Sequence, residues 1–314
     1  MTPIVTLTLN PALDLAVETD AVIAGPKLRC SAPRVDPGGG GVNVSRVIKR
    51  LGGETLALVA IAGATGERLA AALTRENVPF WSLPAPGETR ESLTVTDRTS
   101  ARQYRFVLPG PAWRRGDVGA VLDTASQSVT RGQFLVLSGS LPPGVPEDFV
   151  AELAHRIAQA GGLLAADTSG GALAETSARA PRLDLLRMDE REAEALAGHA
   201  LPEPGDSADF AEALVQKGVA RRVVVSRGAE GTVMAGPEGR FHSRAAAVPV
   251  KSRTGAGDSF VAAMVLSLAL GERPERALQA GMAAASAAVM TGATELCLAE
   301  DARRLIRECP VTEL

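Results

Sequence analysis

The sequence has few of the residues that build disulfide frameworks, zinc sites and base-stacking surfaces. Only 3 of its 314 residues are cysteine, 3 are histidine, and aromatic residues make up 3%. Cys30, Cys297 and Cys309 are an odd number, and the chain has no CxxC or HxxxH pair. We therefore expect reduced thiols in a cytoplasmic protein and predict no structural zinc.

Excess basic charge and long apolar runs are lacking as well. The net charge is −3, and the 33 lysine and arginine residues are spread along the chain, whereas a nucleic-acid binder needs a concentrated basic face. No uninterrupted apolar stretch approaches the about 20 residues of a membrane span. The opening "MTPIVTLTLN" lacks the basic start of a signal peptide and is typical of a strand. We expect neither a nucleic-acid partner nor a membrane partner.

Hydrophobic residues are abundant, at 46% of the chain, which is enough for a large core. Apolar runs typical of strands, among them 4–9, 54–63, 134–140 and 182–189, alternate with segments at helical spacing. Strands separated by helices imply right-handed crossovers and a mainly parallel sheet with helices on both faces. The predicted fold class is therefore α/β.

Two extended segments, 11–35 and 90–108, interrupt this alternation. The second has period-two alternation around a turn, which predicts a hairpin. We predict that the two segments form one small β sheet inserted at an edge of the core, as a lid or a contact surface. The predicted core then consists of residues 1–10, 36–89 and 109–314.

A run of four glycines, 38–41, stands before a predicted helix in "DPGGGGVN". Consecutive glycines are conformationally costly, so the run indicates positive φ or close approach of the backbone to another group. Its amides could bind hydroxyl or phosphate oxygens, although a flexible turn is the ordinary alternative. The GxGxxG spacing of a dinucleotide site is absent, and so is the GxxxxGK[ST] of a P-loop.

Three further turns carry small residues next to predicted strands or helices. "SGSLPPGV" (138–145) and "SRGAEG" (226–231) each end a strand, and "TGAGD" (254–258) precedes an apolar run. Because the carboxyl ends of parallel strands meet at one edge of a sheet, these turns would present a row of amides there. The combination favours a phosphate-bearing ligand. Asp258 is either a helix cap alone or a carboxylate held beside that phosphate.

The segment "RMDEREAE" (187–194) ends another strand and begins a helix. Asp189 and Glu192 have the spacing of a capping box. Alternatively, Glu192 lies near a Mg²⁺ that bridges phosphates, directly or through water.

Four basic residues fall in the two inserted segments. On a solvated sheet they would be surface charge, and over a site they would be phosphate clamps. They are Lys27, Arg29, Arg90 and Arg105.

The order of these motifs resembles the ribokinase-like family of carbohydrate kinases from residue 4 to about 296. "GGGGVN" follows an early "NPALD", and "TGAGDSF" precedes an apolar helix near the C-terminus. "TLTLNPALD", "KLRCSAP" and "QYRFVLPG" are most similar to the ATP-dependent 6-phosphofructokinase branch. The 1-phosphofructokinases and the tagatose-6-phosphate kinases are near relatives of that branch.

The resemblance implies transfer of the γ-phosphoryl group of ATP to a ketose phosphate, with fructose 6-phosphate giving fructose 1,6-bisphosphate. By matching position, Asp258 is the base, and the amides of Gly255, Ala256 and Gly257 form the anion hole. The sugar-side matches are Asp14, Gly39, Gly40 and Asn43 for hydroxyls, Lys27, Arg29 and Arg90 for the phosphate, and Ser138 and Ser140 lining the site. The nucleotide-side matches are Arg187, Asp189, Ser226, Gly228 and Ser286, with Glu192 organising Mg²⁺.

The resemblance also implies a homodimer that pairs through the small sheet, and a monovalent cation is a further candidate cofactor. At a helix start, the Asp258 carboxylate is expected to be kept ionised by the helix dipole and to be a weak base. A loose phosphoryl-transfer transition state tolerates such a base. A non-catalytic sugar-phosphate sensor is the alternative of another class, against which the intact "GAGD" counts.

The sequence departs from the family pattern at one place. The family has Asn-x-x-Glu, often after Lys-Pro, whereas this chain has Arg187, Met188 and Asp189 before Glu192. The extra negative charge of Asp189 is expected to change the Mg²⁺ demand or the nucleotide affinity without abolishing turnover.

Overall fold

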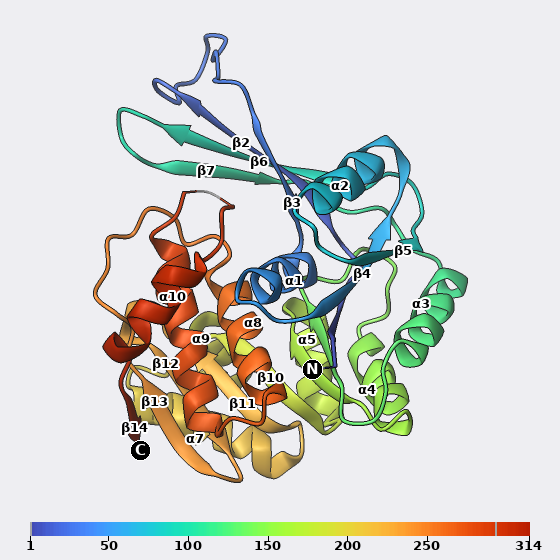
Figure 1. Cartoon of the computed structure of the whole chain (residues 1–314), viewed down its shortest axis with the longest axis vertical. Helices are drawn as coiled ribbons and strands as arrows, with labels where there is room; N and C mark the ends of the chain where they lie inside the picture. Colours follow the sequence, from blue (N-terminus) through green and yellow to red (C-terminus); the bar gives the residue numbers. More distant parts are fainter. Residues whose placement is uncertain (1, 293) are drawn as a thin grey trace.

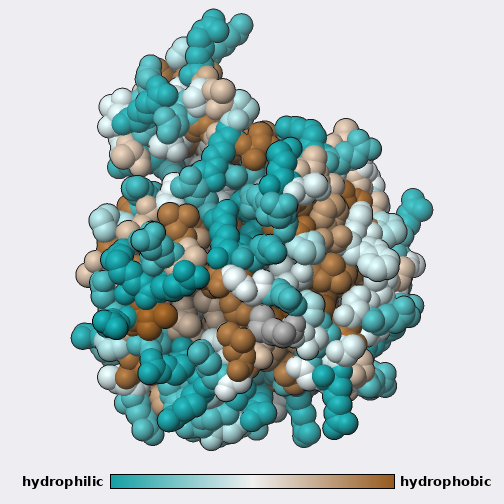
Figure 2. All heavy atoms as spheres, viewed as in Figure 1, coloured by the Kyte–Doolittle hydropathy of each residue, from teal (hydrophilic) through white to brown (hydrophobic). Residues whose placement is uncertain are grey.

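The computed structural model describes residues 2–292 and 294–314. These residues form a large sheet with helices on both faces and a small sheet that stands off the body (Figures 1 and 2). The order of the large sheet is β14-β13-β12-β11-β10-β9-β8-β1-β4-β5. Its strands are β1 (Ile4–Thr8), β4 (Thr55–Ile61), β5 (Phe80–Pro84), β8 (Phe134–Ser138), β9 (Leu163–Asp167), β10 (Leu183–Asp189), β11 (Ala220–Ser226), β12 (Thr232–Gly236), β13 (Gly239–Ser243) and β14 (Val311–Glu313).

The strands from β5 to β11 in this order are parallel, and β12, β13 and β14 add antiparallel pairs at the other edge. The predicted α/β class with a mainly parallel sheet is confirmed. The prediction did not include β5, whose edge position leaves Trp81 61% exposed and breaks the apolar pattern. It also did not include the three antiparallel strands at the other edge, β12, β13 and β14.

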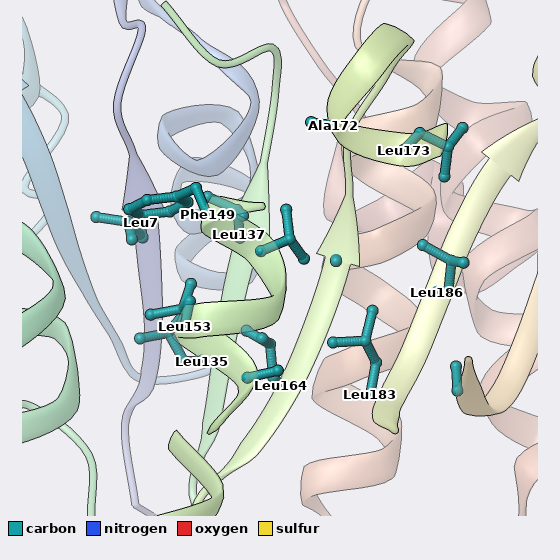
Figure 3. Close-up of a cluster of buried hydrophobic side chains, with 14 of the residues drawn as sticks. Leu7, Leu135, Leu137, Phe149, Leu153, Leu164, Ala172, Leu173, Leu183 and Leu186 are labelled. Atoms are coloured by element: carbon teal, nitrogen blue, oxygen red, sulfur yellow. The ribbon is translucent and has the colours of Figure 1, made fainter. Parts of the chain in front are cut away.

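Helices cover both faces of the large sheet. The alternation of side chains along β1 and β8 sends Leu7, Leu135 and Leu137 into one apolar cluster and Ile4 and Val136 into another. Figure 3 shows the first cluster, where side chains of the strands pack against α4 and α5. The helices are α1 (Gly40–Arg50), α2 (Gly63–Arg75), α3 (Arg115–Gln127), α4 (Phe149–Gln159), α5 (Gly170–Arg179), α6 (Glu190–Ala197), α7 (Pro204–Lys217), α8 (Ala256–Ala269), α9 (Pro274–Val289) and α10 (Ala299–Leu305).

Helix α8 is buried along nearly its whole length. Every residue from Ser259 to Ser267 is buried, and the helix packs against α9 and α1. A helix that is apolar all round is held in place by its neighbours, so its N-terminus has a fixed position. No described helix is long and apolar enough to cross a membrane.

The small sheet has the order β3-β2-β6-β7. It pairs β2 (Ala12–Thr19) in parallel with β6 (Arg90–Asp97), and β3 (Arg34–Gly38) and β7 (Gln103–Val107) flank them antiparallel. Residues 36–38, which the sequence placed in the core, are the last residues of β3, which runs directly into α1. That the small sheet serves as a lid and as a dimer contact stays a prediction.

Candidate active site

Polar side chains stand in a row at the carboxyl ends of the central strands. The register pairs Ser138 of β8 with Asp167 of β9, and Asp167 with Arg187 of β10. It also pairs Asp189 with Ser226 of β11. Paired residues of adjacent strands present their side chains to the same face of the sheet. The sheet register therefore brings these groups together.

Helix α8 delivers Asp258 to this row. The helix begins after the N-cap Gly255, and Asp258 lies in its first turn. The Asn43 side-chain amide donates a 2.9 Å hydrogen bond from Nδ2 to Asp258 Oδ2, and Ser138 Oγ lies 3.3 Å from Asp258 Oδ1. Ser138 Oγ also lies 3.3 Å from Asp167 Oδ2. A hydroxyl has one hydrogen, so Ser138 can donate to only one of the two carboxylates at a time.

Burial makes Asp258 more basic than its place at a helix start suggests. Desolvation, and next the negative charge of Asp167, raise its pKa to about 6, against the opposing effects of Asn43, Arg187 and Ser138. The prediction of a weak base was therefore wrong, because the cost of burying the charge exceeds the help of the helix dipole.

Arg187 belongs to this row, and its guanidinium lies next to the first turn of α8. Its Nη1 is 3.2 Å from Asp167 Oδ1, and its Nε donates a 3.2 Å hydrogen bond to Ser226 Oγ. A Cβ atom on Gly257 would lie 3.1 Å from Arg187 Nη1. A fixed positive charge thus stands directly beside the amides of the predicted anion hole.

The glycine run passes through the site in close contact with two polar side chains. A Cβ atom on Gly38 would collide with the Asp14 carboxylate, and one on Gly40 would collide with Ser138 Oγ. Gly39 has a φ of +108°, which L side chains rarely adopt. Close approach and positive φ are both confirmed, and the flexible-turn alternative is not supported.

Asp14 and two arginines gather where the small sheet meets the core. Burial raises the pKa of Asp14 to about 6, although the charges of Arg105, Arg90 and Arg46 lower it. Arg90 donates two hydrogen bonds, of 3.3 and 3.1 Å, to the Asn10 carbonyl oxygen. The site therefore combines a buried carboxyl group with cations that could receive a phosphate.

Not every predicted sugar-side residue joins this group. Lys27 and Arg29 are exposed on the 20–33 loop at the far tip of the small sheet (Figure 1). None of the hydrogen bonds or ion pairs found for the described residues joins either side chain to Asp14 or Arg90. Ser140 does lie close by, since its hydroxyl accepts a 3.2 Å hydrogen bond from Asn10 Nδ2.

On the other side of the row, Asp189 and Glu192 form the predicted capping box. The Glu192 amide donates to Asp189 Oδ1 at 2.9 Å, and the Asp189 amide donates to Glu192 Oε2 at 2.8 Å. Burial raises the pKa of Glu192, and so do the charges of Asp189 and Asp167. The capping prediction is confirmed, and the negative charges of Asp167, Glu192 and Asp189 favour the charged form of Arg187.

The chain matches the pfkB family of carbohydrate kinases over residues 7–301. It belongs to that family. The kinase is 39% identical to ATP-dependent 6-phosphofructokinase isozyme 2 of Escherichia coli, over 97% of this chain and 98% of the relative. It is 32% identical to the 1-phosphofructokinase of Xanthomonas campestris pv. campestris, over 84% and 83% of the two chains.

The fold of the kinase has a close counterpart among solved structures. It matches phosphofructokinase-2 from Escherichia coli in complex with substrates and products with a TM-score of 0.92 and 38% identity, over 98% and 99% of the two chains. The resemblance drawn from the motifs, the ribokinase-like fold and the prediction of a phosphotransferase acting on an alcohol group are confirmed.

Two residues of the kinase's site were missed from sequence. Asp167 is the last residue of the strand "LLAAD", just as Ser138 is the last residue of "FLVLS". A polar residue at the end of a buried strand was therefore a signal from which Asp167 could have been predicted as a site residue. Asn10 follows the first strand and contacts both Ser140 and Arg90. Its side chain lies next to Gly110, which is far away in sequence, so no local pattern indicated it.

One nucleotide-side prediction is not supported by the geometry. Ser286 is a buried residue of α9, and its hydroxyl accepts a 3.2 Å hydrogen bond from the Ala246 amide and lies 3.9 Å from Cys309 Sγ. The structure thus places Ser286 in the core and does not join it to Arg187. Gly228, in contrast, follows Ser226 at the sheet edge and has open space beside it.

Proposed function

We propose that the kinase transfers the γ-phosphoryl group of ATP to the free primary hydroxyl of fructose 6-phosphate. The observation that carries this proposal is the buried Asp258 carboxylate, held by Asn43 and Ser138 beside the Arg187 cation. A base with a raised pKa next to a positive charge suits a reaction that removes a hydroxyl proton while a phosphoryl group arrives.

In the proposed reaction, Asp258 accepts the proton of the attacking hydroxyl. The hydroxyl oxygen forms a bond to the γ-phosphorus, the bond from that phosphorus to the bridging oxygen breaks, and ADP leaves with the electron pair. The amides of Gly255, Ala256 and Gly257 would donate to the oxygens of the transferring group. Arg187 would stabilise its charge, which is the main requirement of a loose transition state.

On the sugar side, Asp14 and the nearby backbone of Gly39 and Gly40 would bind hydroxyls of the ketose. Arg90 and Arg105 would bind the phosphate already on the substrate. Both are near enough to Asp14 for their charges to lower its pKa, so both cations face the place where the sugar would lie. Neutral Asp14 could donate a hydrogen bond to a sugar hydroxyl, whereas ionised Asp14 could only accept one.

The residues at the sheet edge fit Mg²⁺, which takes one or two protein carboxylates and otherwise keeps water and phosphate oxygens. Glu192 uses Oε2 for its cap, and none of the hydrogen bonds found among the described residues uses Oε1. Glu192 would hold the ion, directly or through water, and the ion would offset phosphate charge. A solved structure of the Escherichia coli relative is in complex with potassium, which supports a monovalent cation as a further cofactor.

A second candidate function keeps the same chemistry and changes the sugar. The similarity to a 1-phosphofructokinase supports fructose 1-phosphate as an alternative acceptor, and tagatose 6-phosphate is the other alternative. The deciding experiment compares kcat/KM for these two and for fructose 6-phosphate at saturating MgATP. We expect fructose 6-phosphate to have the highest value, and a preference for fructose 1-phosphate would overturn this proposal.

We further propose a cytoplasmic homodimer that pairs through the small sheets. Phe106, Val107 and Leu108 at the edge strand β7 are 52–59% exposed, and an unpaired apolar edge strand favours association with a second copy. A dimer would also offer the exposed Lys27 and Arg29 to the site of the partner. Phe106→Asp should shift the mass in sedimentation equilibrium from dimer to monomer, and an unchanged mass would contradict this interface.

A further inference from the structure

We propose that Arg46 is a positioning residue that fixes the Asn43 amide and, through it, the Asp258 carboxylate. This inference rests on the proposed role of Asp258 as the base. Arg46 lies on α1, one turn after Asn43, and its side chain is fully buried, with 0% of its surface exposed. Arginine is rarely buried completely, and this one contacts Asn43 in the candidate site, so it is not a surface charge.

The guanidinium is held rigidly by a carboxylate on the side away from the site. Its Nε and Nη2 donate hydrogen bonds of 2.8 and 2.6 Å to the two oxygens of Glu76. This bidentate geometry fixes the plane of the group. The remaining nitrogen, Nη1, then points to Asn43 Oδ1 at 3.2 Å and to the Pro37 carbonyl oxygen at 3.0 Å.

The chemistry of the two side chains permits only one orientation of the amide. A guanidinium donates and never accepts, so the atom of Asn43 that faces Arg46 must be the oxygen. The amide nitrogen must then face Asp258, and it donates to Oδ2 at 2.9 Å. A flipped amide would place NH₂ against a cation and oxygen against a carboxylate, and both contacts would repel.

Arg46 therefore ensures that Asn43 donates to the base. Without it, only the Asp258 carboxylate distinguishes the two ends of the amide, so the hydrogen bond to Asp258 is held less firmly. That hydrogen bond favours the ionised carboxylate and fixes its plane, so losing it would leave the base less often charged and less well aimed at the hydroxyl.

The substitution that removes this contact leaves the other buried charges partnered. In an Arg46→Met variant, Glu76 keeps Arg50 at 3.6 Å, and Asp36 keeps Arg34 at 2.9 Å. Methionine also fills much of the space of the arginine stem. A folded variant is expected, and its melting temperature checks this before any kinetic comparison.

A double-mutant cycle tests whether Arg46 acts through Asn43. Arg46→Met and Asn43→Ala should each lower kcat by about tenfold or more, as for the loss of one hydrogen bond to a charged group. The double variant should be no slower than Asn43→Ala alone, because the second change removes nothing further. Losses that multiply would mean that Arg46 supports the fold only and would overturn the proposal.

Two further variants separate position from stability. Glu76→Gln leaves the guanidinium one accepting oxygen in place of two, so it should lower the melting temperature and slow kcat less than Arg46→Met does. Arg46→Lys keeps a donor without the bidentate fork and should recover part of the lost kcat. An Arg46→Lys variant as slow as Arg46→Met would contradict the positioning role.

A spectroscopic measurement makes the inference independent of the reaction. In the wild type, the ¹⁵N and ¹H resonances of the Asn43 side-chain amide should shift with pH as Asp258 ionises, and in Arg46→Met this dependence should become clearly smaller. An undiminished dependence in Arg46→Met would overturn the proposal. If the dependence becomes smaller while Asp258→Asn retains full turnover, the amide is positioned as inferred and the proposed role of Asp258 as base fails.

Discussion

At the residue scale, the proposed function depends most on Asp258. Asp258→Asn removes the proton acceptor and keeps the size of the side chain, so kcat should fall by about 10²- to 10⁴-fold while fructose 6-phosphate still binds. Steady-state kinetics and calorimetric titration measure the two effects. Asp301, which also lies in the first turn of a helix, is the matched control, and Asp301→Asn should leave kcat unchanged.

The pH dependence follows from the two buried carboxyl groups. Asp258 and Asp14 both have a pKa raised to about 6, so kcat/KM should fall as the pH drops through about 6 and the base is protonated. Asp167→Asn removes a like charge and should move this limb to lower pH by up to about one unit. Asp184→Asn, at the other end of β10, is the control, and an equal shift there would contradict the assignment.

The same raised pKa predicts a gain in stability when the charge is removed. The folded pKa of Asp258 lies above its ordinary value of 3.8, so the folded state binds the proton more tightly, and stability falls as the pH rises from about 4 to 6. Asp258→Asn should therefore raise the free energy of unfolding above pH 6, by at most about 3 kcal/mol, and change it little near pH 4. Chemical denaturation at both pH values tests this.

Asp189 tests the departure from the family pattern. Asp189→Asn keeps an N-cap of equal quality, so the melting temperature should be unchanged. Loss of the negative charge beside the proposed nucleotide site should alter the Mg²⁺ concentration for half-maximal rate or lower the KM for ATP. If both remain at the wild-type values, Asp189 serves only as the cap.

At the scale of elements, the sequence indicated those whose signal is local. The capping box of α6, the glycine turn before α1 and the hairpin of β6 and β7 each depend on residues within a few positions of one another, and all three are present. Strands β12 to β14 were missed because each depends on its neighbours for pairing. Helix α5 was missed as well, and its ten residues include two glycines and few large apolar side chains.

The glycine turn gives a prediction at this scale. Gly40→Ala forces α1 away from Ser138, so it should lower kcat/KM by at least about tenfold and destabilise the protein by about 1–3 kcal/mol. Gly119→Ala, on α3, has no heavy atom within 4 Å of the added Cβ and should stabilise by up to about 1 kcal/mol. Measuring both variants separates the steric effect from the loss of a glycine.

At the scale of the molecule, sequence reasoning placed most of the site on one edge of the sheet, because parallel strands all end there. It missed Asp167, whose place at the end of a strand was readable but whose contacts depend on the register of β9 with β8 and β10. It also could not measure how deeply Asp258 is buried, and so underestimated its basicity. Distances in space, such as that from Lys27 to the site, lie outside what a motif encodes.

The Ser138 hydroxyl gives the site one movable part. From Arg46 to Arg187, a continuous path of donors and acceptors runs through the site, and the neighbours of each amide and guanidinium dictate its orientation. Ser138 alone can rotate, giving its hydrogen either to Asp258 or to Asp167. The hydroxyl thus has two settings, and each leaves a different carboxylate without this one hydrogen bond. A cation arriving near Asp167 would favour the setting that releases this hydrogen towards Asp258.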